Sequence, residues 1–599
     1  MSAEIRTTQI NLEGLLEVLG KNLYSTPVVV VRELVQNAFD ACVRRRIESG
    51  WTGVPQVRIT VDPDRHTLAI GDNGAGLTRQ EIIDFLATIG SGYTRVLRNR
   101  TQDENAVGYF GLGFLTAYVV SDNVEFLTRS YIEQADCLRF ASAGGQQYTI
   151  DSAADRPVGS EVVLHLKDTF HDLADYEFIE QIVRKYCCLL PIDIVLGDSD
   201  EPVNRIEVPW RLEDASELRI KKASLEFAGV FDHSFQPIVT IPLPLDEDTG
   251  VQGLLWIQDG SYYATSDNRI TTIFIRSMHI TDECKELLPE WAGFVGCVID
   301  SASLTPTASR ESVQQDKYFA AVRAYVKQVL IDAIVRLAVE RGADWRRLQS
   351  RHNQSLLGAS ISDPMLFDAM RDQLALPTSE GELTVEEICK RSGERRLRLA
   401  LEQEGGYEYL IARSMGVPVV YGYRFAAASF CRMRSQDGDI TLTTLGSRES
   451  SGDLFPNQPL DDDNLAIFER YYGRADTKLV VSNFEPACLP AVRVLDQDAL
   501  LRKRLEADEL DEHLGSAALM LAKRYTDSLD IEQEAYLYLN YANPVIRGFI
   551  DLPDERRDQV AKILIAMTEL MHGPAGETNS TAAMETLSNE LLAIARSVS

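Results

Sequence analysis

The sequence predicts an α+β fold divided among several domains. Three observations support this prediction. At 599 residues the chain is too long for one hydrophobic core, and a common domain size of about 150 residues gives about three to five units. Helix-like and strand-like stretches alternate through most of the chain, whereas the C-terminal part is mostly helical in pattern. The content of 45% hydrophobic and 25% charged residues is typical of a globular protein.

The first block, residues 1–205, begins with a predicted helix over 28–48, where apolar side chains are dense. An acidic segment at 198–202 ends in proline, which favours a linker after this block. Apolar patterns and turn residues predict strands at 56–62, 67–71, 123–128 and 161–166, and a helix at 114–120.

The second block, residues 206–455, also mixes strands with helices. The stretch 447–463 is rich in Ser, Asp and Pro, which indicates a boundary. Strands are predicted at 253–257 and 272–275, and a helix at 316–341. The third block, residues 456–599, is predicted to be mostly helical. It ends in two amphipathic helices separated by Gly573-Pro574.

The helix predicted at 28–48 carries three polar residues on one side. Glu33, Asn37 and Asp40 lie within roughly 60° of one another on a helical face. They form a narrow polar stripe on an otherwise apolar helix. Such a stripe needs a partner, and the sequence further along supplies two glycine-rich candidates.

The first candidate is "AIGDNGAGL", residues 69–77, in which a short strand runs into Asp72. Gly74 and Gly76 allow the backbone and Asp72 to approach a flat ligand closely, although Asp-Asn-Gly alone is typical of a simple turn. The second is "GYFGLGF", residues 108–114. Glycines before a helix expose backbone N–H groups that suit a phosphate.

These glycines match neither the dinucleotide-binding pattern G-x-G-x-x-G nor the phosphate loop G-x-x-x-x-G-K-[ST]. A third element, "GSEVVLHL" from residue 159, begins a strand with the hydroxyl of Ser160. Each element is common by itself, and their order along the chain is the informative feature.

In this order "LYSTPVVVVRELVQNAFDA", "DNGAGL", "GYFGLGF" and "GSEVVLHL" resemble the ATP-binding Bergerat fold of gyrase B, MutL, histidine kinases and the 90-kilodalton heat-shock chaperones. The lead-in "LYSTPVVVVREL" is similar to the chaperone branch, bacterial HtpG type. Residues 280–317 independently resemble the chaperone middle domain. The resemblance implies a Bergerat-fold α/β sandwich at the N-terminus, an α/β middle domain and a mostly helical C-terminal dimerisation domain.

The resemblance also implies roles for the polar stripe. The amide oxygen of Asn37 would hold Mg²⁺, which takes its other ligands from phosphate and water. Glu33 would be the general base that accepts a proton from the attacking water. Asp40 supports the nucleotide through water, or equally well makes a hydrogen bond to nearby backbone.

Asp72 would accept a hydrogen bond from the amino group of adenine and repel the carbonyl oxygen of guanine, so the site selects ATP over GTP. Ser160 would join the adenine network through water. Backbone N–H groups of residues 111–114 would bind the phosphates. The implied nucleotide-binding residues are Asn37, Asp40, Asp72, Gly76, Leu77, Gly111, Leu112, Gly113, Phe114 and Ser160, and the implied metal ligand is Asn37.

Arg310 and Gln314 are implied catalytic residues of the middle domain. Their spacing of four residues places them one turn apart on a shared face if this segment is helical. The resemblance implies that they reach the γ-phosphate, where a planar guanidinium stabilises the transferring group. Hydrolysis would then require the two domains to close, and nucleotide would bias an open–closed equilibrium.

The sequence departs from the family pattern near the pocket. Phe85 stands where an asparagine is usual, and residues 87–94 lack a common lysine. These differences affect the expected behaviour of the lid, residues 90–106.

The leading hypothesis is therefore an ATP-driven, Mg²⁺-dependent homodimeric chaperone that clamps client proteins and dimerises through its C-terminal domain. We expect it to be cytoplasmic, because no secretory signal or membrane span is visible. The last residues, Arg596–Ser599, lack the acidic pentapeptide that docks tetratricopeptide cochaperones, so none is expected. The net charge of −30 disfavours nucleic-acid binding.

Two alternatives remain at this point. A DNA-acting ATPase of the gyrase B or MutL kind shares the same pocket, and salt-dependent affinity for duplex DNA would favour it. A nucleotide-binding scaffold without turnover would keep the pocket and lack ATPase activity.

Overall fold

The structure is a computed structural model that describes residues 28–598 except 89–112, 133–134, 146, 261–266, 308–310, 402–406, 476, 496–534 and 571–577. The chain divides into two compact units, residues 1–351 and 352–599. Each unit is described by itself.

A seven-stranded sheet, in the order β5-β4-β3-β6-β2-β1-β7, organises the first part of unit one. Its neighbours are antiparallel except β1 and β7, which are parallel. The strands are β1 (Gln56–Asp62), β2 (Thr67–Asp72), β3 (Ser121–Arg129), β4 (Cys137–Ala143), β5 (Gln147–Ser152), β6 (Gly159–Leu166) and β7 (Asp193–Leu196). The helices are α2 (Val28–Ser49), α3 (Arg79–Glu81), α5 (Thr116–Val120) and α6 (Tyr176–Tyr186).

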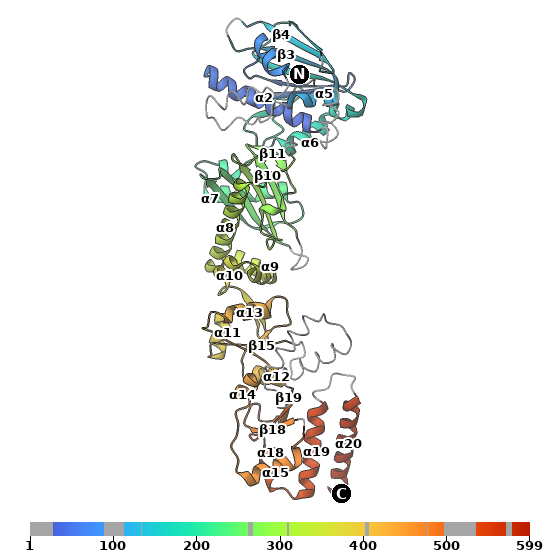
Figure 1. Ribbon diagram of the computed structural model, residues 1–599, viewed down its shortest axis with the longest axis vertical. Helices are drawn as coiled ribbons and strands as arrows, with labels where there is room; N and C mark the ends of the chain where they lie inside the picture. The colour runs from blue at the N-terminus through green and yellow to red at the C-terminus, as the bar shows by residue number, and fades with distance from the viewer. Residues whose placement is uncertain are drawn as a thin grey trace, which may run out of the picture. The chain divides into compact units, whose positions relative to one another are not determined.

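Helix α2 lies along one face of this sheet (Figure 1). Buried and half-buried residues alternate in β2 and β6, as expected of strands that pack on a core with one face. Leu34 and Val35 of α2 share a hydrophobic cluster with Ile70, Phe126 and Leu164 of the strands. Residues at the strand ends on this same face therefore point toward α2.

A second, five-stranded sheet in the order β11-β10-β12-β9-β8 follows in unit one. Its strands are β8 (Pro237–Asp246), β9 (Val251–Gln258), β10 (Ile270–Ile275), β11 (Met278–Thr281) and β12 (Val295–Ser301), and its helices are α7 (Glu217–Phe231) and α8 (Lys317–Glu340). Phe227 of α7 packs with Trp256 and Phe274 of the sheet. Asp316 caps α8 by accepting hydrogen bonds from the backbone N–H groups of Tyr318 and Phe319.

Unit two contains a five-stranded sheet in the order β14-β13-β16-β15-β17. The strands are β13 (Ala375–Thr378), β14 (Gly381–Thr384), β15 (Arg396–Ala400), β16 (Val419–Tyr421) and β17 (Thr441–Thr444). The helices are α9 (Ala343–Ser362), in which the unit boundary falls, α10 (Pro364–Met370), α11 (Val385–Ser392), α12 (Tyr407–Ser414), α13 (Ala427–Ser435) and α14 (Arg448–Leu454).

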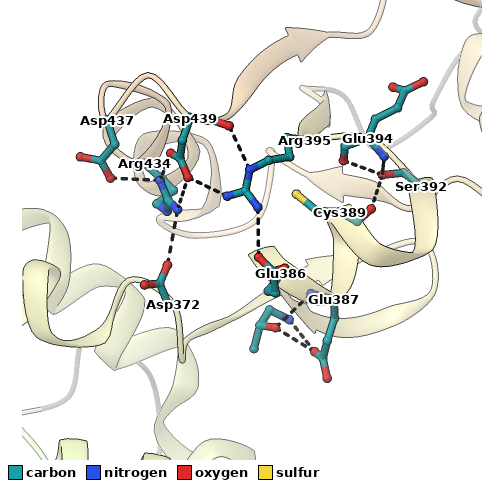
Figure 2. Close-up of polar contacts among 11 residues, drawn as sticks. Asp372, Glu386, Glu387, Cys389, Ser392, Glu394, Arg395, Arg434, Asp437 and Asp439 are labelled. Atoms are coloured by element: carbon teal, nitrogen blue, oxygen red, sulfur yellow. Dashed lines mark hydrogen bonds and ion pairs between the residues drawn. The ribbon is translucent and has the colours of Figure 1, made fainter.

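An ion-pair network links α13 with α11 and with the loops that precede β15 and β17 (Figure 2). Arg434 lies 2.6 Å from Asp439 and 3.5 Å from Asp372, and Arg395 lies 2.6 Å from Asp439 and 3.3 Å from Glu386. Arg434 and then Arg395 hold the pKa of Asp439 well below its usual range. Every charge in this network faces an opposite one, so we assign the network a structural role.

The C-terminal part of unit two differs from its prediction, because it also contains a three-stranded sheet in the order β18-β20-β19. The strands are β18 (Thr477–Ser482), β19 (Ala491–Leu495) and β20 (Ala535–Asn540), and the helices are α15 (Asp462–Tyr472), α18 (Pro544–Gly548), α19 (Asp554–Leu570) and α20 (Thr578–Val598). The pairs β18–β20 and β19–β20 join segments far apart in sequence, which local patterns do not reveal. The two predicted terminal helices are confirmed as α19 and α20.

Most predicted elements of the first block are confirmed, including α2 and β1. The helix predicted at 114–120 is a short 3₁₀ turn, Gly113–Leu115, followed by α5. Residues 198–202 form a turn and not an extended linker: Val203 N–H donates to the Ile194 carbonyl at 2.9 Å, and Arg58 pairs with Asp200 at 3.0 Å. Similarly, the polar stretch 447–463 contains α14.

No helix among the described residues combines the length and apolar character that crossing a bilayer requires.

Candidate functional site

The polar stripe of α2 is confirmed as a feature of the fold. Glu33 and Asp40 are buried, with 2% and 7% of their surfaces exposed, whereas Asn37 between them is exposed. The guanidinium of Arg32 lies 3.5 Å from Oε1 of Glu33. The exposed amide of Asn37 can contact a ligand directly, and the buried carboxylate of Glu33 lies behind it, one helical turn away.

The end of the glycine-rich segment meets this stripe at Gly113. A Cβ atom added to Gly113 would lie 2.8 Å from Oε2 of Glu33 and 3.7 Å from Nδ2 of Asn37. A larger residue at 113 would therefore displace the carboxylate end of Glu33, whereas its contact with Asn37 would be an ordinary one. The structure therefore brings together three predicted site residues; Gly111 and Leu112 lie outside the described residues.

The ring of Phe114 packs in the core, so only the backbone of this residue is available to the candidate site. The ring packs edge-to-face on Tyr118 at 6.0 Å and on Phe126 at 6.3 Å between centroids. This packing anchors the segment in the core. The Thr116 hydroxyl donates to the Gly113 carbonyl at 2.6 Å, which fixes the turn that carries Gly113.

The Asp72 loop is tied to the same helix by main-chain contacts. The N–H group of Ala75 donates to the Ala41 carbonyl of α2 at 2.9 Å, and Tyr131 N–H donates to the Ala75 carbonyl at 2.9 Å. Gly76 has a φ of +63°, and a Cβ atom there would lie 2.0 Å from the Arg129 carbonyl oxygen. Glycine is thus required at 76, and the loop has a fixed position beside α2.

Asp72 is the titratable group of greatest interest in this region. Oδ1 accepts hydrogen bonds from the N–H groups of Gly74 at 2.7 Å and Ser160 at 3.4 Å. Burial among protein atoms raises the pKa of Asp72 to about 7, and these two N–H groups, Arg156 and Arg45 only partly oppose it.

This shift predicts pH-dependent binding of adenine compounds. Oδ1 already has two donors, so a proton added near pH 7 occupies Oδ2 and turns that oxygen from acceptor to donor. We expect affinity to fall roughly eightfold between pH 7.5 and 6, as for one group titrating at about 7. Adenosine is the appropriate probe, because it has no group that titrates in this range.

The Glu33→Ala variant serves as a control and should show the same pH profile as the wild type. A profile that is flat from pH 8 to about 5 would contradict the role of Asp72.

The stability of the fold should change with pH in the opposite direction. The folded chain keeps the Asp72 proton up to about pH 7, whereas the unfolded chain loses it near 3.8. The contribution of Asp72 to the free energy of unfolding therefore decreases as pH rises through this window.

Ser160 lies beside Asp72 because the two residues are register partners on β6 and β2. The buried Thr128 of β3 pairs with Ser160 on the other side, and the two hydroxyl oxygens are 3.0 Å apart. Thr128 Oγ1 also accepts the N–H group of Leu77 at 2.9 Å. Sequence reasoning predicted Ser160 and Leu77 and missed Thr128, which joins them.

Asn73 and Arg45 were also missed. The Asn73 side chain accepts the Gln56 N–H at 2.9 Å and donates to the Val54 carbonyl at 2.8 Å, so it fixes the start of β1. Arg45 donates to the Asn73 carbonyl at 2.6 Å. Both residues therefore hold the Asp72 loop from outside.

The sequence predicts that Arg310 and Gln314 share one face of a helix. This prediction is wrong for Gln314, which lies before the start of α8. Its N–H group donates to the Thr305 carbonyl at 2.9 Å, and its side-chain amide donates to the Pro306 carbonyl at 3.1 Å. Because Pro306 also pairs with Val313 in an antiparallel bridge, residues 305–307 and 312–314 form the two arms of a hairpin, and α8 begins only at 317. Arg310 lies outside the described residues, as does the lid, 90–106.

Phe85, a departure from the family pattern, is half-buried on a short π-helix, Ile82–Leu86. The donor set at Asn37 fits Mg²⁺, since an accessible amide oxygen beside the Gly113 turn would supply one hard ligand. No group of three or more His, Cys, Asp or Glu side chains in the described part of the chain could hold a metal. A metal at Asn37 would therefore take most of its ligands from nucleotide and water.

Comparison with known proteins agrees with this geometry. The family model described as "Histidine kinase-, DNA gyrase B-, and HSP90-like ATPase" matches residues 24–147, which include α2, the Asp72 loop and Gly113. Residues 24–147 thus resemble an ATPase domain of this type. A second family model, described as "Hsp90 protein", matches residues 257–376.

Curated relatives agree with both matches. The protein named "Chaperone protein HtpG" from Rhodococcus jostii is 28% identical over 428 residues, which cover 64% of this chain and 66% of the relative. Its namesake from Mycobacterium avium is 29% identical over 422 residues (63% and 64%), and that from Chlorobium phaeobacteroides is 29% identical over 357 residues (56% of each). The matched regions thus cover between 56% and 66% of these relatives, less than two thirds of each. The chain is similar to proteins of the Hsp90 family, and among them to the bacterial HtpG type.

Proposed function

We propose that this chain is an ATP-dependent molecular chaperone that binds and remodels client proteins as a homodimeric clamp in the cytoplasm. One observation carries the nucleotide part of the proposal. Gly113 lies against Glu33 and Asn37, while the bond from Ala75 to Ala41 holds the Asp72 loop on the same helix. A helix with a phosphate-binding turn near its start and an adenine-binding acid near its end suits ATP.

Each residue has a distinct task in the proposed reaction. Asp72 accepts the adenine amino group, and backbone N–H groups around Gly113 bind the phosphates. Asn37 would hold Mg²⁺, which neutralises phosphate charge when bound. Glu33, beside Gly113, accepts the proton of the attacking water.

The chaperone reading is favoured over a DNA-acting ATPase by two observations. The Hsp90 match at residues 257–376 lies beyond the ATPase domain, and the net charge of −30 opposes binding to phosphate backbones. The name of the relatives, which describes chaperones, is consistent with this choice.

Dimerisation through the C-terminal helices is supported by exposed apolar side chains on α20. Met584, Leu591 and Leu592 are 60%, 53% and 50% exposed. Two copies of the α19–α20 pair could bury these side chains in a four-helix bundle, the arrangement that the family resemblance implies. We do not expect a tetratricopeptide cochaperone to bind this chain.

The deciding experiment measures ATP turnover and suppression of aggregation of a heat-unfolded reporter enzyme by the full-length chain. The proposal expects slow Mg²⁺-dependent turnover, and protection of the reporter that depends on ATP. Nucleotide binding without turnover would favour the scaffold alternative. Salt-dependent affinity for duplex DNA without protection would favour the DNA-acting alternative.

Arg310→Ala should bind ATP normally and hydrolyse it poorly, because loss of a transition-state guanidinium costs turnover and not ground-state affinity. We expect kcat to fall about 10²-fold or more. Arg323→Ala, an exposed arginine on α8, is the matched control and should hydrolyse ATP like the wild type. Unchanged turnover in Arg310→Ala would remove this arginine from the mechanism.

A further inference from the structure

Thr128, Ser160 and Asp72 form a row across three strands. Ser160 on β6 is the register partner of Thr128 on β3 and of Asp72 on β2. Register partners project to the same face of a sheet, here the face that packs on α2. Thr128 is fully buried and Ser160 is 5% exposed, so bulk water does not compete strongly for their hydroxyl groups.

The hydrogen bonds of Thr128 restrict the proton of Ser160. A hydroxyl group has one proton and two lone pairs. One lone pair of Thr128 accepts the Leu77 N–H at 2.9 Å, and its proton has two acceptors within reach, Ser160 Oγ at 3.0 Å and the Gly159 carbonyl at 3.2 Å. Two arrangements follow from this choice.

In the first arrangement Thr128 donates to Ser160, and the proton of Ser160 is then free to point into the pocket beside Asp72. In the second, Thr128 donates to Gly159 and Ser160 donates to Thr128, so that Ser160 offers the pocket only lone pairs. The ring nitrogens N1 and N7 that flank the adenine amino group are acceptors, so they favour the first arrangement.

We propose that Thr128 is a positioning residue that directs the proton of Ser160 toward a purine ring nitrogen, and so sets purine specificity together with Asp72. This inference rests on the proposed nucleotide site and deepens it. Asp72 recognises a donor on the base, and the Thr128–Ser160 pair recognises the neighbouring acceptor, directly or through one water. Guanine presents the O6 acceptor to Asp72 and so fails the first requirement; it also fails the second if the ring nitrogen is N1, which carries a proton in guanine, but not if it is N7, which is an acceptor in both purines.

The same hydroxyl connects the base to the segment that leads toward the lid. The Leu77 N–H group donates a hydrogen bond to the Thr128 hydroxyl. The next residue, Thr78, caps α3 and forms a capping box with Glu81. A variant that lacks the Thr128 hydroxyl loses the acceptor of Leu77 as well as the donor to Ser160.

The test compares ADP with 1-deaza-ADP and 7-deaza-ADP, which lack one ring nitrogen each, by titration calorimetry at pH 8, where Asp72 is ionised. In the wild type we expect one of the two analogues to bind about tenfold more weakly than ADP, as for loss of one hydrogen bond. In Thr128→Val this ratio should shrink to about twofold or less, because the directed proton is missing. Thr128→Ser keeps a hydroxyl and should restore the wild-type ratio, whereas Ser160→Ala should abolish it.

A purely structural role would weaken ADP and both analogues by the same factor and leave the ratio unchanged in Thr128→Val, which would overturn the inference. If Thr128→Val does not fold, an unchanged ratio in Ser160→Ala would overturn it equally. Wild-type protein that binds neither ADP nor its analogues would instead contradict the proposed nucleotide site itself.

Discussion

Replacing Asp72 by asparagine is expected to abolish nucleotide binding. The side-chain oxygen would remain with the Gly74 N–H, which lies 2.7 Å from Oδ1 of Asp72. The new NH₂ group would then take the place of Oδ2 and face the adenine amino group, donor against donor. We expect the Kd for ADP to rise at least about 10²-fold, because a buried polar group is left unpaired on both sides.

Titration calorimetry with ADP measures this effect. Asp151→Asn, at an exposed position of β5 in the same sheet, removes the same charge and should bind like the wild type. Circular dichroism must show that Asp72→Asn is folded. A folded Asp72→Asn protein that binds ADP within about threefold of the wild type would place the adenine elsewhere.

Glu33→Ala should bind ATP and fail to hydrolyse it. Loss of a general base typically lowers turnover about 10²–10⁴-fold, whereas the carboxylate makes no contact that the bound ground state requires. The Thr116 hydroxyl bonds the Gly113 carbonyl and the Phe114 ring packs in the core, so the Gly113 turn should keep its place when the Glu33 side chain is shortened. Single-turnover hydrolysis and calorimetry separate the two effects.

Glu33→Gln is the isosteric companion, since it keeps the volume and removes the basicity. Glu48→Ala, nearer the end of α2, is the control for a lost acidic residue on this helix and should leave turnover unchanged. Equal loss of binding and hydrolysis in Glu33→Ala would show that Glu33 supports the pocket and does not act on water.

Local pattern was sufficient for much of the first block. The apolar spacing of α2 and the alternation in β1 and β2 predicted these elements nearly to their ends, because both faces of a packed element leave a periodic signal. The polar stripe was also visible, since three residues on a 100° spacing define a face. The contact between this stripe and Gly113 followed only from the family resemblance.

Features that depend on distant pairing were not predictable from local pattern. Thr128 meets Ser160 at a separation of 32 residues, and a threonine in a strand is too common to carry a signal. Gln314 was expected on a helix, but the pairing of Pro306 with Val313 makes a hairpin, and Asp316 starts the helix later. The sheet of β18, β19 and β20 escaped prediction for the same reason.

The main-chain bond from Ala75 to Ala41 has a consequence for how far the surrounding sequence can diverge. Contacts between backbone atoms do not depend on which side chains surround them, so the place of the Asp72 loop beside α2 tolerates substitution of those side chains. This is compatible with an identity of only 28% to the Rhodococcus jostii relative.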